Sequence, residues 1–392
     1  MKTKFIMMAA FAAMFSASFV ACTNEESQGV PQTENKSIAF IDNTRSGVAT
    51  RALEANTADI QADGMLVWGC SADATHEANA FMFGTANTGV DFAWNATEGS
   101  FISNPEYLWS SVQNLSFIAM TPRSGGGIDG TSFNAAVAAN SPNPSLSVDV
   151  SIPTTLATQK DIMFAAANSK NYDDDVAGLT APATGKPKAL PLTFKHALSQ
   201  IKFKGKLEYG TSITKVTVKE ISLVNVACAG TLNITSSSDV TTCTVSGYGA
   251  TNNTLTANIV NADVTDTYKT AAGTTYLDIT NGDAGNNAAT RTQQIYMLPQ
   301  IVNTGVSAQQ SSYDIPASGA YLRVKIDMWL NGTADANKVL TDKFVYIKLN
   351  ETTWLPNFTY IYNLEFSDNL MNPIRFTTSI DYWLAENRPY TL

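Results

Sequence analysis

Strict alternation of apolar and polar residues in short runs is the feature that most constrains how this chain can fold. Leu322, Val324, Ile326 and Met328 occupy every second position of one such run, and charged residues fill the positions between them. Successive side chains of a β-strand point to opposite faces of the sheet. The run therefore predicts a strand with one face against a core and the other face in solvent.

Runs of this kind recur along the chain, whereas helical spacing is scarce. Ile201, Phe203 and Leu207 form a second inward set, with lysines at 202, 204 and 206 facing outward. Further strands are predicted at residues 115–120, 216–226, 343–349, 359–366 and 374–380. The one short helix candidate covers residues 133–139, with an Ala-rich loop as the alternative. Short alternating strands separated by clusters of Gly, Asn, Pro and Ser predict an all-β fold of antiparallel sandwiches.

The segment 181–191 is the predicted boundary between two such sandwiches. It contains three prolines and two lysines, and proline is poorly tolerated in sheet interiors and in helices. The segment is therefore expected to be a linker or a crossing edge strand. This places one sandwich at residues 52–186 and the other at 187–392.

The start of the chain is typical of an exported protein. Lys2 and Lys4 precede an apolar run over residues 5–20, which ends just before Cys22. That run is shorter than the roughly 20 residues needed to span a bilayer, so a signal peptide over residues 1–21 is favoured over a membrane anchor. A cysteine directly after the cleavage site predicts lipidation at Cys22, with an ordinary secretory signal as the alternative.

Residues 22–51 form the predicted leader of the mature chain. A strand-like run covers 36–41, in which Ile38 and Phe40 form an alternating apolar pair. Arg45 and Arg51 follow in a polar segment without a helix or strand signal. They indicate a second, proteolytic processing site after export, and ordinary solvated arginines are the alternative.

Composition argues against nucleic-acid binding and against catalysis. The formal charge of −9 is the wrong sign for contacts with phosphates. Two histidines, His76 and His196, give little material for a metal centre or a Ser-His-Asp triad. The acidic run 173–175 lacks the glycine and distal glutamate of a calcium loop. We therefore expect no enzymatic activity, no metal and no cofactor.

The chain has four cysteines, too few for a disulfide scaffold. Cys228 and Cys243 flank the loop 236–239, so that a hairpin could bring them face to face. One cross-strand disulfide between them is the resulting hypothesis. Cys70 is then expected to be a buried apolar residue.

Several segments, taken in order, resemble the fimbrillins that build type V pili. They begin with the lipidation motif and the two arginines, and continue with segments similar to family elements: Tyr107–Trp109, Leu115–Pro122, Asp161–Ala165, Phe194–Phe203, Tyr296–Gln300, Thr359–Leu364 and Ile380–Trp383. Each motif is weak alone, but their order over residues 20–385 makes the resemblance more specific.

The resemblance implies two tandem transthyretin-like β-sandwiches and assembly by strand exchange. It implies lipoprotein export with a palmitate-type anchor on Cys22, and cleavage by an arginine-specific protease after Arg51 or Arg45. The cut would remove the first strand, and the vacated groove would accept a strand from another fimbrial subunit. The expected location is the cell outer membrane and the fimbrium.

Two further points stay open at this stage. The run 374–384 is a candidate donor strand, with an edge strand of the second sandwich as the alternative. The alternative function is a surface lipoprotein that does not polymerise and binds a host protein or a glycan, including a tip adhesin or an anchor subunit. Six tryptophans could stack on sugars, although most lie in strand patterns and are expected in the core.

Overall fold

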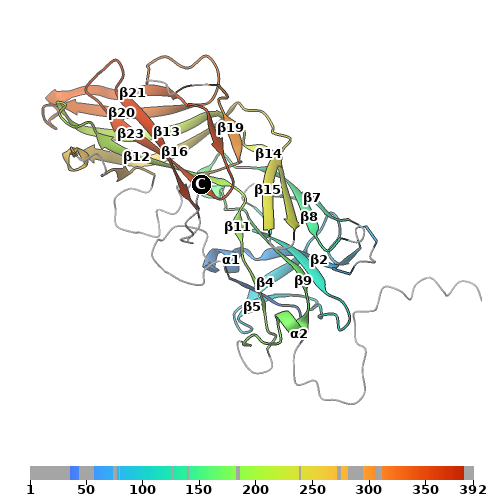
Figure 1. The fold of residues 1–392 in the computed structure, drawn as a ribbon. Helices are drawn as coiled ribbons and strands as arrows, with labels where there is room; N and C mark the ends of the chain where they lie inside the picture. Colours follow the sequence, from blue (N-terminus) through green and yellow to red (C-terminus); the bar gives the residue numbers. More distant parts are fainter. Residues whose placement is uncertain are drawn as a thin grey trace, which may run out of the picture.

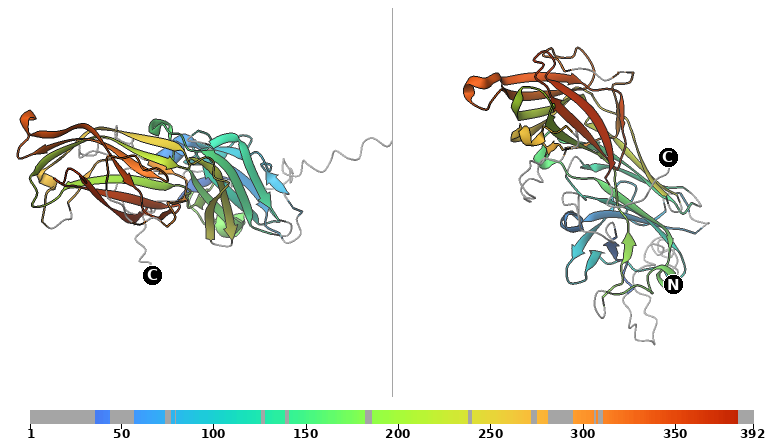
Figure 2. Two further views of the ribbon diagram at one scale, coloured as in Figure 1. Left: turned by 90° about the horizontal axis from the view of Figure 1, so that it is seen from above. Right: turned by 60° about the vertical axis from the view of Figure 1, so that its left-hand side comes forward.

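The computed structural model describes residues 36–43, 57–73, 77–78, 80–125, 128–138, 141–181, 186–237, 240–271, 275–280, 295–305, 307 and 311–383. Within these residues nearly all regular structure is β-strand. The strands form two sandwiches arranged end to end in an elongated molecule (Figures 1 and 2). The predicted all-β sandwich fold is confirmed. The short helices are α1 (Thr57–Asp63), α2 (Tyr172–Asp175), η1 (Leu156–Thr158), η2 (Asp266–Tyr268) and η4 (Asp335–Asn337).

The N-terminal sandwich is built on a nine-stranded sheet of order β10-β1-β5-β4-β2-β6-β9-β11, with β3 paired to β2. Its strands are β1 (Phe40–Asp42), β2 (Met65–Ser71), β3 (Phe81–Phe83), β4 (Val90–Asn95), β5 (Ser100–Ser103), β6 (Leu115–Thr121), β9 (Met163–Lys170), β10 (Leu190–Leu192) and β11 (Lys195–His196).

This sheet curls over itself. In a flat sheet β1 and β6 would lie roughly 19 Å apart, because four spacings of about 4.8 Å separate them. The rings of Phe40 on β1 and Phe117 on β6 are nevertheless only 5.2 Å apart. The curled sheet therefore encloses its own apolar core, which includes Ile38, Met65 and Leu190.

A four-stranded sheet covers the other face of the nine-stranded one. It has the order β15-β14-β8-β7 and consists of β7 (Ile128–Val137), β8 (Pro144–Ser151), β14 (Ala229–Ser237) and β15 (Val240–Ser246). Trp68 of β2 packs against Phe133 of β7, with ring centroids 5.5 Å apart. Residues 133–137 are thus strand rather than the helix or loop expected from their alanines, because the buried ring and its sheet neighbours outweigh local propensity.

The sheets do not divide at residue 187, where the prolines placed the boundary. The β14–β15 hairpin follows that point but pairs with β8, from Ala229↔Ser151 to Thr235↔Ser145. β10 and β11 also lie after residue 187 and complete the N-terminal sheet. The reason is that these partners are distant in sequence, so no local signal reports the pairing.

The C-terminal sandwich packs two larger sheets face to face. One has the order β17-β12-β23-β24, with β18 on β12, and the other has the order β16-β13-β20-β21. Its strands, including a separate pair β19–β22, are β12 (Ser199–Leu207), β13 (Ile213–Val226), β16 (Asn253–Thr265), β17 (Leu277–Asp278), β18 (Ile295–Met297), β19 (Gln300–Val302), β20 (Tyr321–Leu330), β21 (Lys338–Lys348), β22 (Thr352–Trp354), β23 (Phe358–Phe366) and β24 (Ile374–Tyr382).

The strands predicted from alternation are all present in the structure. One detail differs from a purely antiparallel sandwich: β12 pairs with β23 in parallel, from Gln200↔Thr359 to Leu207↔Phe366. β1 and β10 are also parallel. Parallel neighbours need a long connection, which alternation within each strand does not report.

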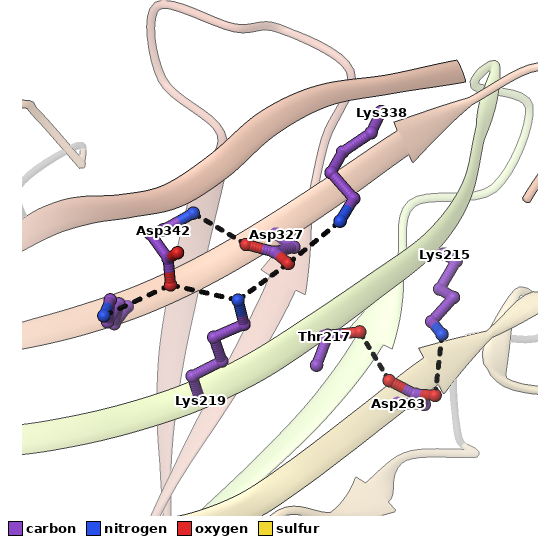
Figure 3. Close-up of polar contacts among 8 residues, drawn as sticks. Lys215, Thr217, Lys219, Asp263, Asp327, Lys338 and Asp342 are labelled. Atoms are coloured by element: carbon purple, nitrogen blue, oxygen red, sulfur yellow. Dashed lines mark hydrogen bonds and ion pairs between the residues drawn. The ribbon is translucent and has the colours of Figure 1, made fainter. Parts of the chain in front are cut away.

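Charged residues cover the outward face of the β16-β13-β20-β21 sheet (Figure 3). Lys219 bridges Asp327 at 2.8 Å and Asp342 at 3.0 Å. Lys338 contacts Asp327 from a third strand, and Lys215 pairs with Asp263 at 2.8 Å. Lys215 and Lys219 of β13 therefore lie on the solvent face, and each is paired with a carboxylate.

Candidate functional site

The first strand lies inside the N-terminal sheet rather than at its edge. Phe40 pairs with Leu190 of β10 on one side and with Phe101 of β5 on the other. The hydrogen bonds to β10 include one on either side of the strand's own ladder: the Leu190 amide donates to the Ala39 carbonyl at 2.8 Å, and the Asn43 amide donates to the Leu192 carbonyl at 2.8 Å. Removal of the strand would leave the facing sides of β10 and β5 without partners.

Residues 36–38, which precede β1, are hydrogen-bonded to the loop 106–109. The Ile38 amide donates to the Tyr107 carbonyl at 2.7 Å, and the Trp109 amide donates to the Lys36 carbonyl at 3.0 Å. Ser37 and Leu108 form an isolated antiparallel bridge. The whole segment 36–43 is therefore hydrogen-bonded to its neighbours as one extended segment.

Apolar side chains of this segment fill the core of the curled sheet. The Phe40 ring meets Phe92 at 5.0 Å and Phe117 at 5.2 Å, both edge to face. Ile38 and Phe40 are buried, so the predicted alternating pair is in the core. Burying two such side chains contributes roughly 3–6 kcal/mol.

Polar contacts fix the start of the strand. The Lys36 ammonium lies 4.7 Å above the Tyr172 ring and 3.6 Å from Asp173. The Ser37 hydroxyl donates to Glu106 at 2.5 Å. Asp173 belongs to α2, a single helical turn capped by Asn171.

Sequence reasoning identified the strand, and it left the neighbouring segment 181–191 as either a linker or a crossing edge strand; β10 begins at the end of that segment and lies at the edge of the sheet. β10 carries Leu190 and Leu192 into the same core, and Pro191 between them lies opposite Ile41. Proline has no amide hydrogen to donate, which suits a strand at the end of the sheet. The Leu-Pro-Leu alternation was the signal available for this strand.

The predicted processing residues fall outside the described residues. Cys22, Arg45 and Arg51 all lie in ranges that the structure does not describe. Asn43 is the last described residue after β1, and the description resumes at Thr57 with α1. Both arginines therefore belong to the stretch of sequence that joins β1 to the rest of the chain.

The candidate donor strand is an edge strand of the C-terminal sandwich. β24 pairs with β23 in antiparallel register, from Phe358↔Tyr382 to Phe366↔Ile374. Ile380 near its end is 59% exposed. β24 is thus only partly covered near its end.

Trp383 anchors the end of β24 at the junction of the two sandwiches. Its ring is completely buried and stacks on His196 of β11, with centroids 4.0 Å apart, and on Tyr296 of β18, with centroids 5.3 Å apart. His196 Nδ1 in turn lies 2.6 Å from a carboxylate oxygen of Asp161. These contacts give His196 a structural role in the core.

Cys228 and Cys243 are free thiols in the structure, and the predicted disulfide between them is not formed. The hairpin register explains this, because Cys243 lies opposite Ile234, whereas Cys228 precedes the hairpin strands. Burial raises the pKa of Cys70 and of Cys243 to about 12, and that of Cys228 to about 11. All three thiols stay protonated at neutral pH and are poor nucleophiles.

Tryptophan side chains do not provide open platforms for sugars. Trp68, Trp109, Trp329, Trp354 and Trp383 are buried. The partly buried Trp94 packs edge to face against Phe101, with centroids 5.1 Å apart. Core packing, the role expected for at least four of them, accounts for five.

Two other kinds of site are absent from the described residues. Within that part of the chain, no group of three or more His, Cys, Asp and Glu side chains is placed to hold a metal ion. Every helix there is too short or too polar to cross a lipid bilayer.

Three solved structures show what the chain is similar to. A fimbrial protein from Bacteroides vulgatus is 14% identical, with a TM-score of 0.54, and the match covers 89% of this chain and 100% of that one. A candidate cell adhesion protein from Bacteroides uniformis is 13% identical, with a TM-score of 0.44 and coverage of 90% and 100%. The tip fimbrial protein Mfa3 from Porphyromonas gingivalis is 11% identical, with a TM-score of 0.29 and coverage of 82% and 94%.

Of these three structures, only the Bacteroides vulgatus protein supports an inference, and that inference concerns the fold alone. No curated protein matches the sequence. The sequence model of the fimbrillin-like family, in contrast, matches residues 50–383, which is most of the chain. The chain therefore belongs to the fimbrillin-like family.

Proposed function

We propose that this protein is a structural or adhesive subunit of a surface fimbria that is exported as a lipoprotein, trimmed after an arginine and assembled by strand exchange. In this proposal Cys22 carries the lipid that holds the precursor at the outer membrane. Cleavage after Arg51 or Arg45 then frees the leader together with β1. The protein has a structural role and no catalytic one.

One observation carries the proposal: β1 is a short strand inserted between two others, and the sequence just after it contains both arginines. A cut there separates β1 from the rest of the chain, while its non-covalent contacts with β10, β5 and the loop 106–109 remain. An extended segment from another subunit can replace those backbone hydrogen bonds and fill the same pockets. Until the cut, β1 protects the groove from premature pairing.

The contacts of the C-terminal strand argue against its donation to another subunit. Withdrawal of β24 would break its ladder with β23 and extract Trp383 from its stack on His196 and Tyr296. In our proposal β24 therefore stays in its own sandwich, and the polymer contact on this chain is the N-terminal groove.

The test is to replace both arginines by lysine in the producing cells. Arg45→Lys with Arg51→Lys keeps the positive charge but removes the arginine side chains that an arginine-specific protease recognises. We expect the variant to keep its lipidated Cys22 and to be missing from fibres sheared from the cells, as measured by mass spectrometry. The unaltered protein should begin at Ser46 or Ala52.

Arg375→Lys is the matched control, because Arg375 is an exposed arginine on β24 that pairs with Glu208. It should be trimmed and incorporated normally. Normal incorporation of the double variant would refute cleavage at these arginines. A non-polymerising lipoprotein would instead show persistent lipidation of Cys22 in the unaltered protein.

A further inference from the structure

The two faces of the first strand are both closed. Ile38 and Phe40 fill the core on one face. On the other face Ser37 and Ala39 are also buried, and Ala39 has no exposed surface at all. Ile41, the next residue on that second face, is 38% exposed. A strand in this position therefore needs a small residue at position 39, whereas position 41 tolerates a larger or polar one.

The surroundings of position 39 are also unfavourable for a negative charge. Ser37 lies two residues away on the same face, and its hydroxyl already donates to the carboxylate of Glu106. A carboxylate at position 39 would lose its water and would lie near that anion. An uncompensated buried charge is strongly destabilising.

The chain's own C-terminal strand fails at this position in two registers. Aligned in the direction of β1, the run Ser379-Ile380-Asp381-Tyr382 matches Ser37-Ile38-Ala39-Phe40 in its serine, its isoleucine and its aromatic residue. It places Asp381 where the groove holds the Ala39 methyl group. The other aliphatic–aromatic step, Ile374-Arg375-Phe376, places a larger charged residue there.

We propose, building on the strand acceptance proposed above, that the groove selects a strand with a small uncharged residue between its aliphatic and aromatic side chains. β24 of a second copy does not meet this requirement. The groove therefore takes its strand from a different polypeptide, and the chain joins a heteropolymer instead of stacking on itself through β24. Ala39 marks the position that determines the specificity.

A peptide exchange experiment tests this selection. The full chain is cut with an arginine-specific protease, the single cut is confirmed by mass, and labelled peptides are added to replace the severed β1. The peptide of residues 33–43 should bind, and its Ala39→Asp variant should bind at least about 100-fold more weakly. The Ile41→Asp variant is the matched control and should bind within about threefold of the unaltered peptide, because that position is partly exposed.

Peptides from β24 complete the test. The peptide of residues 375–385 should bind at least about 100-fold more weakly than that of residues 33–43, and Asp381→Ala should recover most of the difference. If the peptide of residues 33–43 fails to bind, the strand acceptance itself is wrong and both proposals fall. If it binds but Ala39→Asp or the β24 peptide binds equally well, selection by Ala39 is refuted while strand acceptance stands.

Discussion

At the scale of single residues, Asp327 is the best defined charged group of the C-terminal sandwich. Burial by itself raises its pKa, but hydrogen bonds from Lys219, from the Asp342 amide and from Lys338 act in the opposite direction and prevail. The pKa of Asp327 is therefore below its usual value. The Asp342 amide reaches it at 2.7 Å, beside the irregularity in the β20–β21 pairing (Figure 3).

We expect Asp327→Asn to lower the free energy of unfolding at pH 7 by roughly 1–3 kcal/mol, the contribution of hydrogen bonds to a charged group. A carboxylate with a lowered pKa stabilises the fold above its unfolded pKa of about 3.9, and this stabilisation is lost as the pH falls through the folded pKa. The difference between protein and variant should therefore shrink below about pH 4. Urea unfolding at several pH values measures it.

Asp335→Asn is the control for this prediction, because Asp335 is exposed at the start of η4, between β20 and β21. It should leave stability within about 0.5 kcal/mol at every pH. A difference for Asp327→Asn that stays constant from pH 7 to pH 3 would show that the charge of Asp327 contributes nothing.

At the scale of elements, β1 depends on its neighbours for its order. Its named strand has three residues, and its ordering depends on β10, on β5 and on the rings of Phe92 and Phe117. β24, in contrast, has nine residues and a full ladder with β23. On these contacts β1 should be easier to displace from its sheet than β24.

Hydrogen exchange should report the loss of β1 directly. When the cut chain is depleted of its leader, the Leu190 amide loses the Ala39 carbonyl that it now contacts at 2.8 Å. We expect exchange in residues 186–194 and 99–104 to speed up at least about tenfold, because their local opening becomes easier. Residues 358–382 serve as the internal control, and equal exchange before and after depletion would contradict the placement of β1 as a shared partner.

How far the sequence predicts these elements depends on how local their determinants are. Alternation predicts β12 and β20 correctly, because lysines and apolar residues two apart report both faces of a strand. Phe133 was misassigned because the alanines around it carry no such contrast. The pairing of Phe40 with Leu190, and the stack of Trp383 on His196, join residues far apart in sequence and leave no local trace.

At the scale of the whole molecule, the two sandwiches are interlocked. The β14–β15 hairpin follows β13 of the C-terminal sandwich, yet it pairs with β8 of the N-terminal one. Residues 195–207 pass from β11 in one sheet to β12 in the other. A continuous apolar cluster includes Trp68 of the first sandwich and Tyr362 of the second.

Because of this interlocking, we expect the folded chain to unfold as one cooperative unit. Ile234→Ala in β14 empties a fully buried site and should cost about 2–5 kcal/mol of stability. The loss should reach both sandwiches, so calorimetry should show a single transition at a lower temperature. Hydrogen exchange should speed up together in residues 163–170 of the N-terminal sandwich and residues 321–330 of the C-terminal one.

The matched control is Val339→Ala, which shortens a partly exposed side chain on β21 and should shift the transition little. Two separate transitions, or a loss of protection confined to residues 163–170, would show that the sandwiches unfold independently. A single transition would mean that a strand seated in the N-terminal groove stabilises the entire subunit. In the proposed assembly, each strand that binds the groove would then stabilise the whole subunit that accepts it, because binding to the folded state alone raises the stability of that state.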